Sequence, residues 1–400
     1  MSTVNQIYAI MNSLNAQANL STAIATVDSR NFVSYGDEIL SSASDANKET
    51  WFATLMDRIA STIIDNRAYA TNEDAGLWRE PAEYGCVLQK IHSKMPSVSA
   101  DPAWSAPSDL SSTNPFAPTA REIEQRLYNK VSAFMIADTI PDVQLKTAFE
   151  SPQKMAAFLD SLMMTTQNAY TRSIENLARA CRSALIATSI HEGGAHRVKL
   201  LTGFIATLPD DDPRAEWTTS DIDAIMCDRD FLRYASLQIA LHIDRMQRMT
   251  DMFSATGYER WTPREYMNFA VLSDFDRAVS AYLAADTYHE QIVELPTENR
   301  IVVPFWQSTG TDYGITSTSA VKMVIPRTTG TSEQQAAGYT INENMIVAAI
   351  YDTEAAGITI DERRTRSLYN PKDEFTNYWH KGRQMYYVDA TQPHVIFQIA

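Results

Sequence analysis

Apolar residues recur every three or four positions from residue 151 to residue 188, the longest helical pattern in the chain. The positions on this stripe are Met155, Phe158, Leu159, Leu162, Ala169, Tyr170, Ile174, Leu177, Cys181 and Leu185. Ser151 suits the N-cap and Pro152 the first helical position, and the next glycine is Gly193. The pattern predicts one helix of about 35 residues, about 50 Å long. No second stripe of this length accompanies it, so we expect a spine flanked by strands; a coiled-coil or bundle helix is the alternative.

Shorter patterns precede this helix. Residues 3–18 and 45–66 are amphipathic at helical spacing, and the polar stretch between them is interpreted as an extended arm that packs on something other than its own core. Residues 67–95 contain two β-like pieces around a turn-rich centre, with few apolar residues, which predicts a projecting hairpin. Residues 96–119 contain five prolines among Ser, Ala and Asp, which is typical of a long loop.

The C-terminal half mixes helices and strands. Residues 219–256 are helical in pattern, and Thr262 and Pro263 are expected to begin a further helical run. Strands are predicted where apolar residues alternate or run together, at 289–307, 313–325, 345–351 and through much of 361–400. The fold class is therefore α+β.

Composition restricts the function. The chain has 400 residues, a net charge of −15 and a pI near 4.9, and such a surface repels phosphate, so a sequence-specific nucleic-acid binder is not expected. No apolar run is long enough for a membrane span, and the N-terminus has no signal-peptide pattern. Cys86, Cys181 and Cys227 are widely spaced and are expected to be reduced core residues.

The candidate chemistry is sparse. The segment HEGGAH places His191 and His196 five residues apart, one more than the zinc-protease spacing, and the Gly-Gly pair disfavours a helix there, so a helix C-terminus is expected instead. The acidic run at 210–212 lacks the spacing of a calcium loop. Phosphate-binding and nucleophile-elbow motifs are absent from the sequence. We therefore expect no enzyme, no catalytic residue, no metal and no cofactor, but a chain built for contacts with other copies.

The order of these elements resembles a known family. The resemblance lies in NKETWFATLMDRIASTII, DVQLKTAFESPQKMAAFLDSLM, the long helix up to TSI, and SLYNPKDEFTNYWHKGRQMYYVDATQPHVIF. Together they resemble the major capsid proteins of tailed phages with the Hong Kong 97 fold, and more narrowly the shell proteins of short-tailed phages. The same fold is used by encapsulins.

The resemblance implies a domain plan and an assembly. The implied segments are an N-terminal arm at 1–44, a P-domain helix at 45–66, an E-loop hairpin at 67–95, a Pro-rich insert at 96–119, the P-domain with its spine helix (151–188) at 120–189, an A-domain at 190–344, and a return to the P-domain sheet at 345–400. The implied product is an icosahedral virion shell of hexamers and pentamers that encloses phage dsDNA, assembled in the host bacterial cytoplasm. The implied partners are a portal, separate scaffolding or decoration proteins, and non-specifically contacted DNA, with no membrane.

Four residues of the expected hairpin are candidates for inter-subunit contacts: Trp78, Arg79, Glu80 and Tyr84. Trp and Arg are the residue types that most often anchor interfaces. The alternative for Trp78 is that it folds back on its own subunit. For the whole chain, the alternatives are an encapsulin-like nanocompartment shell and, in another class, a metal-dependent hydrolase around HEGGAH.

Overall fold

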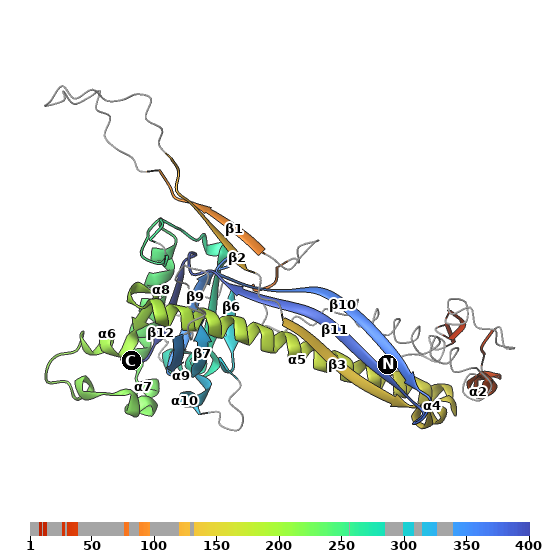
Figure 1. Cartoon of the computed structure of the whole chain (residues 1–400). Helices are drawn as coiled ribbons and strands as arrows, with labels where there is room; N and C mark the ends of the chain where they lie inside the picture. Colours follow the sequence, from red (N-terminus) through yellow and green to blue (C-terminus); the bar gives the residue numbers. More distant parts are fainter. Residues whose placement is uncertain are drawn as a thin grey trace. The chain divides into compact units, whose positions relative to one another are not determined.

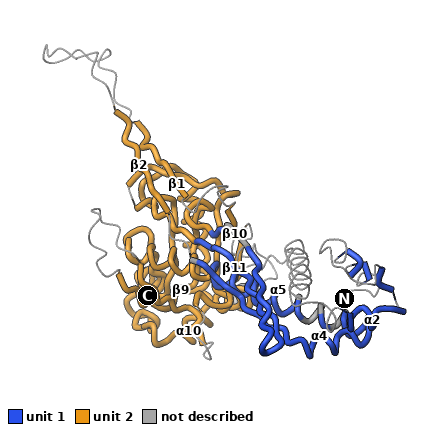
Figure 2. The backbone as a smooth tube through the Cα atoms, turned by 45° about the vertical axis from the view of Figure 1, so that its right-hand side comes forward, with its two compact units in different colours: residues 1–75, 131–178, 358–385 blue, residues 76–130, 179–357, 386–400 orange. Residues whose placement is uncertain are grey.

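The computed structural model describes residues 8–9, 11–13, 26–28, 30–38, 76–79, 88–96, 120–128, 132–255, 257–284, 299–307, 314–325 and 339–400. The chain forms two compact units, each assembled from separate stretches of sequence (Figure 2). Unit 1 contains residues 1–75, 131–178 and 358–385, and unit 2 contains residues 76–130, 179–357 and 386–400.

The long helix α5 (Pro152–Glu192) has 41 residues and confirms the predicted spine, extended by one turn (Figure 1). Leu162, Ile174 and Leu177 of the predicted stripe are all buried. The helix ends where Gly193 adopts a φ of +64°, a conformation that residues with a Cβ rarely take. Its partners in unit 1 include strands, since Tyr170 packs on the ring of Phe134, so the bundle alternative is not supported.

The sheet of unit 1 has three strands in the order β10 (Ala356–Asn370), β11 (Phe375–Val388) and β3 (Ser132–Pro141). β11 and β3 are antiparallel, with Ala137 opposite Trp379. Helix α4 (Asp142–Phe149) follows β3 directly, and its Asp142 side chain accepts a hydrogen bond from the Tyr369 hydroxyl at 3.1 Å.

Part of the N-terminal arm belongs to the core of unit 1, which corrects the expectation that it packs elsewhere. Helix α2 (Phe32–Asp37) buries Phe32 and Tyr35, whose rings lie 5.6 and 6.4 Å from the ring of Phe149. Two aromatic side chains supply enough apolar area to hold so short a helix, although the segment has little periodicity. Residues 8–9 and 11–13 are helical as expected, whereas the predicted helix at 45–66 lies outside the described residues.

Unit 2 is organised around a five-stranded sheet. Its strand order is β4 (Arg197–Lys199), β12 (His394–Gln398), β9 (Ile346–Asp352), β5 (Met267–Leu272) and β6 (Arg300–Val303). The three central strands are buried at every position, as expected for a sheet covered on both faces. The C-terminal part of the chain therefore contributes to two sheets: β10 and β11 join β3, whereas β9 and β12 complete the sheet of unit 2. The expectation for residues 345–400 was a return to a single sheet.

Helices and a small ladder complete unit 2. The helices are α6 (Leu200–Ile205), α7 (Ile222–Cys227), α8 (Arg229–Met246), α9 (Ser273–Ala284) and α10 (Ile315–Thr318), and the ladder pairs β7 (Val321–Ile325) with β8 (Tyr339–Glu343). Asp228 caps α8 by accepting a hydrogen bond from the backbone N–H of Phe231 at 2.8 Å. The helical run expected after Thr262 is wrong in its first part, because residues 267–272 form the buried strand β5. A short apolar run of this kind fits a buried strand as well as a helix face.

A second two-stranded ladder belongs to unit 2 and is called the hairpin ladder below. It pairs β1 (Leu88–Ser93) with β2 (Ile123–Tyr128) in antiparallel register (Figures 1 and 2). The pairing differs from the expected hairpin within 67–95, because the partner of β1 comes from the far side of the Pro-rich segment. Sequence alternation identifies a strand but not its partner.

Candidate assembly site at the hairpin ladder

One face of the hairpin ladder carries charged side chains. Lys90 lies opposite Arg126, and His92 lies opposite Glu124. Residues directly opposite in an antiparallel pair share a face, so all four side chains are on the same side of the ladder. They are less exposed than their neighbours, and His92 is buried. Like charges opposite each other are unfavourable unless acidic groups meet them.

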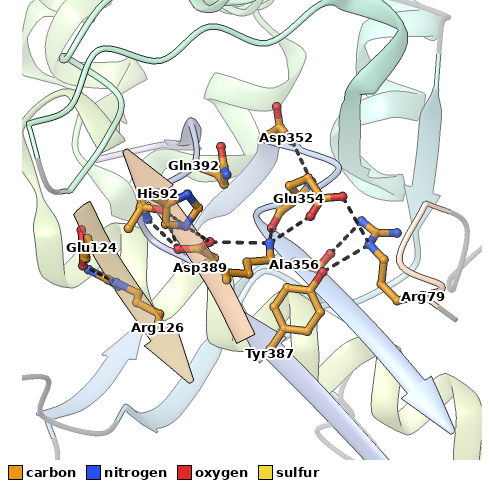
Figure 3. Close-up of polar contacts among 12 residues, drawn as sticks. Arg79, His92, Glu124, Arg126, Asp352, Glu354, Ala356, Tyr387, Asp389 and Gln392 are labelled. Atoms are coloured by element: carbon orange, nitrogen blue, oxygen red, sulfur yellow. Dashed lines mark hydrogen bonds and ion pairs between the residues drawn. The ribbon is translucent and has the colours of Figure 1, made fainter. Parts of the chain in front are cut away.

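Asp389 supplies the central negative charge for this face (Figure 3). Its Oδ2 lies 3.2 Å from His92 Nε2 and 3.5 Å from Lys90 Nζ, and its side chain has no exposed surface. Its Oδ1 accepts hydrogen bonds from the backbone N–H of Thr391 at 3.1 Å and from the Thr391 hydroxyl at 2.7 Å. Asp389 lies five residues before β12, so it joins β1 to the chain that enters the sheet of unit 2.

The carboxylate form of Asp389 is stabilised by these contacts. Burial raises the pKa of Asp389, but the Thr391 hydrogen bonds and the positive charge of Lys90 outweigh it and leave the pKa below its ordinary value. The anchor of the ladder is therefore ionised at neutral pH and holds Lys90 and His92 by charge-assisted contacts.

A second acidic residue, Glu354, receives two cations from separate segments. Its Oε2 lies 3.0 Å from Lys90 Nζ, and its Oε1 lies 4.0 Å from Arg79 Nε (Figure 3). The same Arg79 guanidinium donates to the Tyr387 hydroxyl at 3.2 Å and to the Ala356 carbonyl at 3.3 Å. Lys90 Nζ also lies 4.7 Å from the centre of the Tyr387 ring, a cation–π distance.

The opposite face of the hairpin ladder is apolar and exposed. Ile91 is 63% exposed, Ile123 is 65% exposed and Leu127 is 58% exposed. In the register of the ladder these three residues lie on one face together with Gln89, Ser93 and Gln125. Met95, just past β1, is 45% exposed. The ladder therefore turns its charges toward its own subunit and its large apolar side chains toward solvent, the reverse of an ordinary surface hairpin. Contiguous exposed apolar residues are typical of a surface that binds another protein.

The residues predicted to contact a neighbouring subunit differ in their surroundings. Trp78 is 39% exposed, whereas the Arg79 guanidinium is held by Tyr387 and Ala356 of its own subunit. Glu80 and Tyr84 lie outside the described residues. The hydrophobic pattern alone does not single out Ile91, Ile123 and Leu127 as a surface. Their alternation with charged residues was a signal for two strands, but only the register shows that they share a face.

The histidines of HEGGAH and the described cysteines were the other candidates in the sequence. His191 stacks on Tyr339 at 4.0 Å, and His196 stacks on His394 at 4.4 Å, so the two histidines of HEGGAH have separate partners. No group of three or more metal-ligating side chains occurs among the described residues. Burial raises the pKa of the Cys181 thiol to about 12, which fits the expected core residue. The same expectation is wrong for Cys227, which is exposed, and Cys86 lies outside the described residues.

Within the described part of the chain, no helix is long and apolar enough to cross a membrane. In the acidic run at 210–212, Asp212 belongs to an ion cluster around Arg214. The Arg214 guanidinium lies 2.8 Å from the carboxylate of Asp212, 3.3 Å from that of Asp228 and 2.8 Å from that of Asp230.

Comparison with known families decides the identity. A family model for the Phi29-like phage major capsid protein matches residues 7–398. The chain belongs to the Phi29-like phage major capsid protein family. A search of curated proteins finds no match.

Chains from solved structures of phage particles are similar to this capsid protein. A chain from the structure of the head fiber and inner core protein gp22 of native bacteriophage P68 matches with a TM-score of 0.51 at 9% identity, over 81% of this chain and 83% of that chain. A chain from the capsid structure of Staphylococcus phage Andhra matches with a TM-score of 0.49 at 9% identity, over 84% of each chain. At such low identity the P68 likeness concerns the fold alone.

The expected class is confirmed: the chain is a mixed α and β major capsid protein that forms a phage shell, and it is a structural component of the virion. As a capsid protein it assembles with other copies into a lattice. The encapsulin-like and hydrolase alternatives are not favoured by the family match.

Proposed function

We propose that this capsid protein builds an icosahedral shell of hexamers and pentamers that encloses phage dsDNA, and that the hairpin ladder docks on a neighbouring copy. The observation that carries the docking is the exposed apolar face of Ile91, Ile123 and Leu127. The partner that covers this face is a second copy of the chain, because a lattice of identical subunits brings a neighbour to every subunit. The docking hairpin proposed from the sequence at 67–95 is thereby extended to β2.

The inward face of the ladder supports this assignment. Asp389 and Glu354 hold β1 to unit 2 through Lys90, so the ladder is fixed at its base by contacts inside its own subunit. A fixed base limits the conformational entropy that docking would remove, and pre-organised surfaces bind more tightly than mobile ones. The apolar face is therefore presented in a defined orientation within unit 2.

The remaining elements of the proposal follow the domain plan of the family. Residues 120–189 form the P-domain, except that β2 belongs to the hairpin ladder; residues 190–344 form the A-domain, and residues 96–119 are the Pro-rich insert. The portal and separate scaffolding or decoration proteins are further partners, assembly takes place in the host cytoplasm, and the protein has no enzymatic activity. The net charge of −15 supports an enclosure that contacts DNA without sequence specificity.

The docking is tested with a double variant, Ile91→Ser with Leu127→Ser. Both side chains are more than half exposed, so the unassembled subunit should keep its unfolding midpoint. The yield of closed particles, measured by sedimentation and electron microscopy, should fall at least tenfold. The matched control is Gln89→Ser with Gln125→Ser, which changes two polar residues on the same face and should leave the yield unchanged. Normal particle yield from the apolar double variant would refute the docking.

Substitutions of Trp78 and Arg79 distinguish a role in the interface between subunits from a role inside the subunit. Trp78→Ala should lower particle yield while the subunit's melting temperature stays nearly constant, because the side chain is 39% exposed. Arg79→Ala should instead lower the stability of the subunit, since two of the hydrogen bonds of this side chain go to Tyr387 and Ala356. A large loss of subunit stability in Trp78→Ala would assign Trp78 to its own core.

The lattice and its contents are tested on particles from infected cells. Electron microscopy should show five-fold and six-fold clusters of subunits. An absorbance ratio typical of DNA, retained after nuclease treatment of intact particles, would support enclosed dsDNA. Particles filled with a cargo protein and lacking nucleic acid would contradict the proposal.

A further inference from the structure

Four of the seven histidines gather along one stretch of unit 2, residues 389–398. His394 begins β12, and His196 stacks on it with ring centres 4.4 Å apart. His92 contacts Asp389 and Thr391, each at 3.2 Å from its Nε2. His242 of α8 meets the ring of Phe397 edge-on at 5.4 Å. All four histidines are buried, between 1% and 8% exposed.

The hydrogen bonds of the stacked pair show which ring nitrogen carries a hydrogen. His394 Nδ1 lies 2.8 Å from the carbonyl oxygen of Gln392, and His196 Nδ1 lies 3.0 Å from the carbonyl oxygen of His394. A carbonyl oxygen only accepts, so each Nδ1 carries the hydrogen and the added proton of an imidazolium would reside on Nε2. His394 Nε2 is buried and has no hydrogen-bond partner. A proton placed there would create a buried N–H without an acceptor, next to a second imidazole.

The surrounding charges do not compensate for that proton. Burial is the main cause that lowers the pKa of His394, to about 4, and the electrostatic interaction with His196 adds to it, while the hydrogen bond to Gln392 and the Asp389 carboxylate act in the opposite direction. Across the sheet, β9 presents Tyr351 opposite His394. Arg197, next to His196, is engaged by Gln398 and Glu343. Burial lowers the pKa of His242, and the positive charge of the neighbouring Arg245 lowers it further.

We propose that residues 389–398 form an acid-sensitive latch, in which protonation of His394, buried and stacked on His196, releases β12 from β4 and β9. Opening the latch loosens Asp389 and Thr391 as well, because they lie on the same stretch, and these residues hold His92 of the hairpin ladder. The latch is a property of the folded subunit and does not depend on docking between copies.

The direction of the pH effect follows from the neutral folded-state ring. Above pH 6.5 His394 is neutral in both the folded and unfolded chain, so it adds no pH dependence. As the pH falls from 6.5 toward about 4, the unfolded chain takes up the proton and the folded chain does not, so stability is lost across this interval. For this one histidine the unfolding equilibrium constant should rise roughly fiftyfold between pH 7.5 and 4.5.

The test is urea unfolding of the full-length unassembled subunit at pH 7.5, 6.5, 5.5 and 4.5. In His394→Asn an amide nitrogen replaces Nδ1 as donor and nothing titrates, so the rise in the unfolding constant should be smaller than in the wild type by roughly fiftyfold. The matched control is His191→Asn, since His191 lies in the same unit with an exposed ring. This control should retain the full wild-type rise. An equal rise in the wild type and in His394→Asn would overturn the latch.

Hydrogen exchange of the wild-type subunit provides a measurement that needs no variant. Relative to intrinsic rates, protection of the β12 amides should fall between pH 6.5 and 4.5 by more than that of the β6 amides, which lie at the other end of the same sheet. Equal changes in the two strands, or no change in β12, would also overturn the proposal.

Discussion

Lys90 Nζ lies 3.5 Å from Asp389 Oδ2, which joins the first strand of the hairpin ladder to the stretch that enters the last strand of the chain. The Lys90 side chain is 11% exposed and that of Asp389 is fully buried, so solvent screens this ion pair little. A pair in such surroundings matters mainly through the cost of leaving one partner alone.

Removing the lysine charge should therefore destabilise the subunit. We expect Lys90→Met to lower the free energy of unfolding by about 3 kcal/mol, because the buried Asp389 carboxylate loses a cation. Chemical unfolding measures this change. Lys94→Met is the control, since Lys94 pairs with Glu122 while both side chains are about half exposed or more, and exposed pairs contribute little. Equal effects of the two substitutions would contradict the buried anchor.

The stability of the subunit should also depend on Asp389 in strong acid, at a lower pH than the effect of His394. Because the folded-state pKa of Asp389 lies below its ordinary value of 3.8, its stabilisation is present above pH 3.8 and is lost as the pH falls through the folded-state value. Unfolding curves between pH 5 and pH 2 should show this loss. Asp389→Asn should remove that part of the dependence, and an unchanged acid profile in this variant would contradict the assignment.

Gly36 tests the docking of the N-terminal arm on its own unit. A Cβ at this position would lie 2.5 to 2.7 Å from three side-chain atoms of Phe149, which is too close for ordinary contact. Gly36→Ala should thus displace α2 and lower the free energy of unfolding by about 1–3 kcal/mol. Ser34→Ala, at an exposed position of the same helix, should have almost no effect. If Gly36→Ala is as stable as the wild type, α2 does not pack closely on Phe149 in solution.

The stripe on the spine helix predicts a contrast between buried and exposed positions. Leu162 is 9% exposed and Leu177 is 5% exposed, so replacing either with Asp should cost several kcal/mol and yield insoluble protein. Arg172 is exposed, and Arg172→Ala should be mild. Solubility and melting temperature of the three variants measure the contrast. Equal solubility of all three would show that the stripe does not face the core.

Local signals in the sequence predicted the elements that depend on local interactions. Helix α5 was predicted because Pro152 and Gly193 mark its ends and its apolar period is continuous between them. Strand β9 was predicted as a short apolar run, but the same kind of run at β5 was assigned to a helix. Periodicity does not distinguish a fully buried strand from one face of a helix.

Long-range pairing could not be predicted in the same way. The partner of β1 is β2, on the far side of the Pro-rich segment, and nothing local to either strand specifies the register. The inverted faces of the ladder, with Lys90 inside and Ile91 outside, follow only from that register. Likewise, residue type alone made Arg79 a candidate for an interface, and nothing local to it predicts the hydrogen bonds that it donates to Ala356 of β10 and Tyr387 of β11.

The outward-facing apolar row also bears on how a shell would grow. Under the proposed docking, a free subunit and the rim of an incomplete shell both expose Ile91, Ile123 and Leu127, whereas an interior position covers them. The free energy of an open rim then scales with its length, as a line tension does, because each unmatched subunit leaves apolar area in water. Growth that shortens the rim is favoured, and only closure removes the rim entirely. The same row that makes the lone subunit prone to association would thus drive the assembly toward a sealed container.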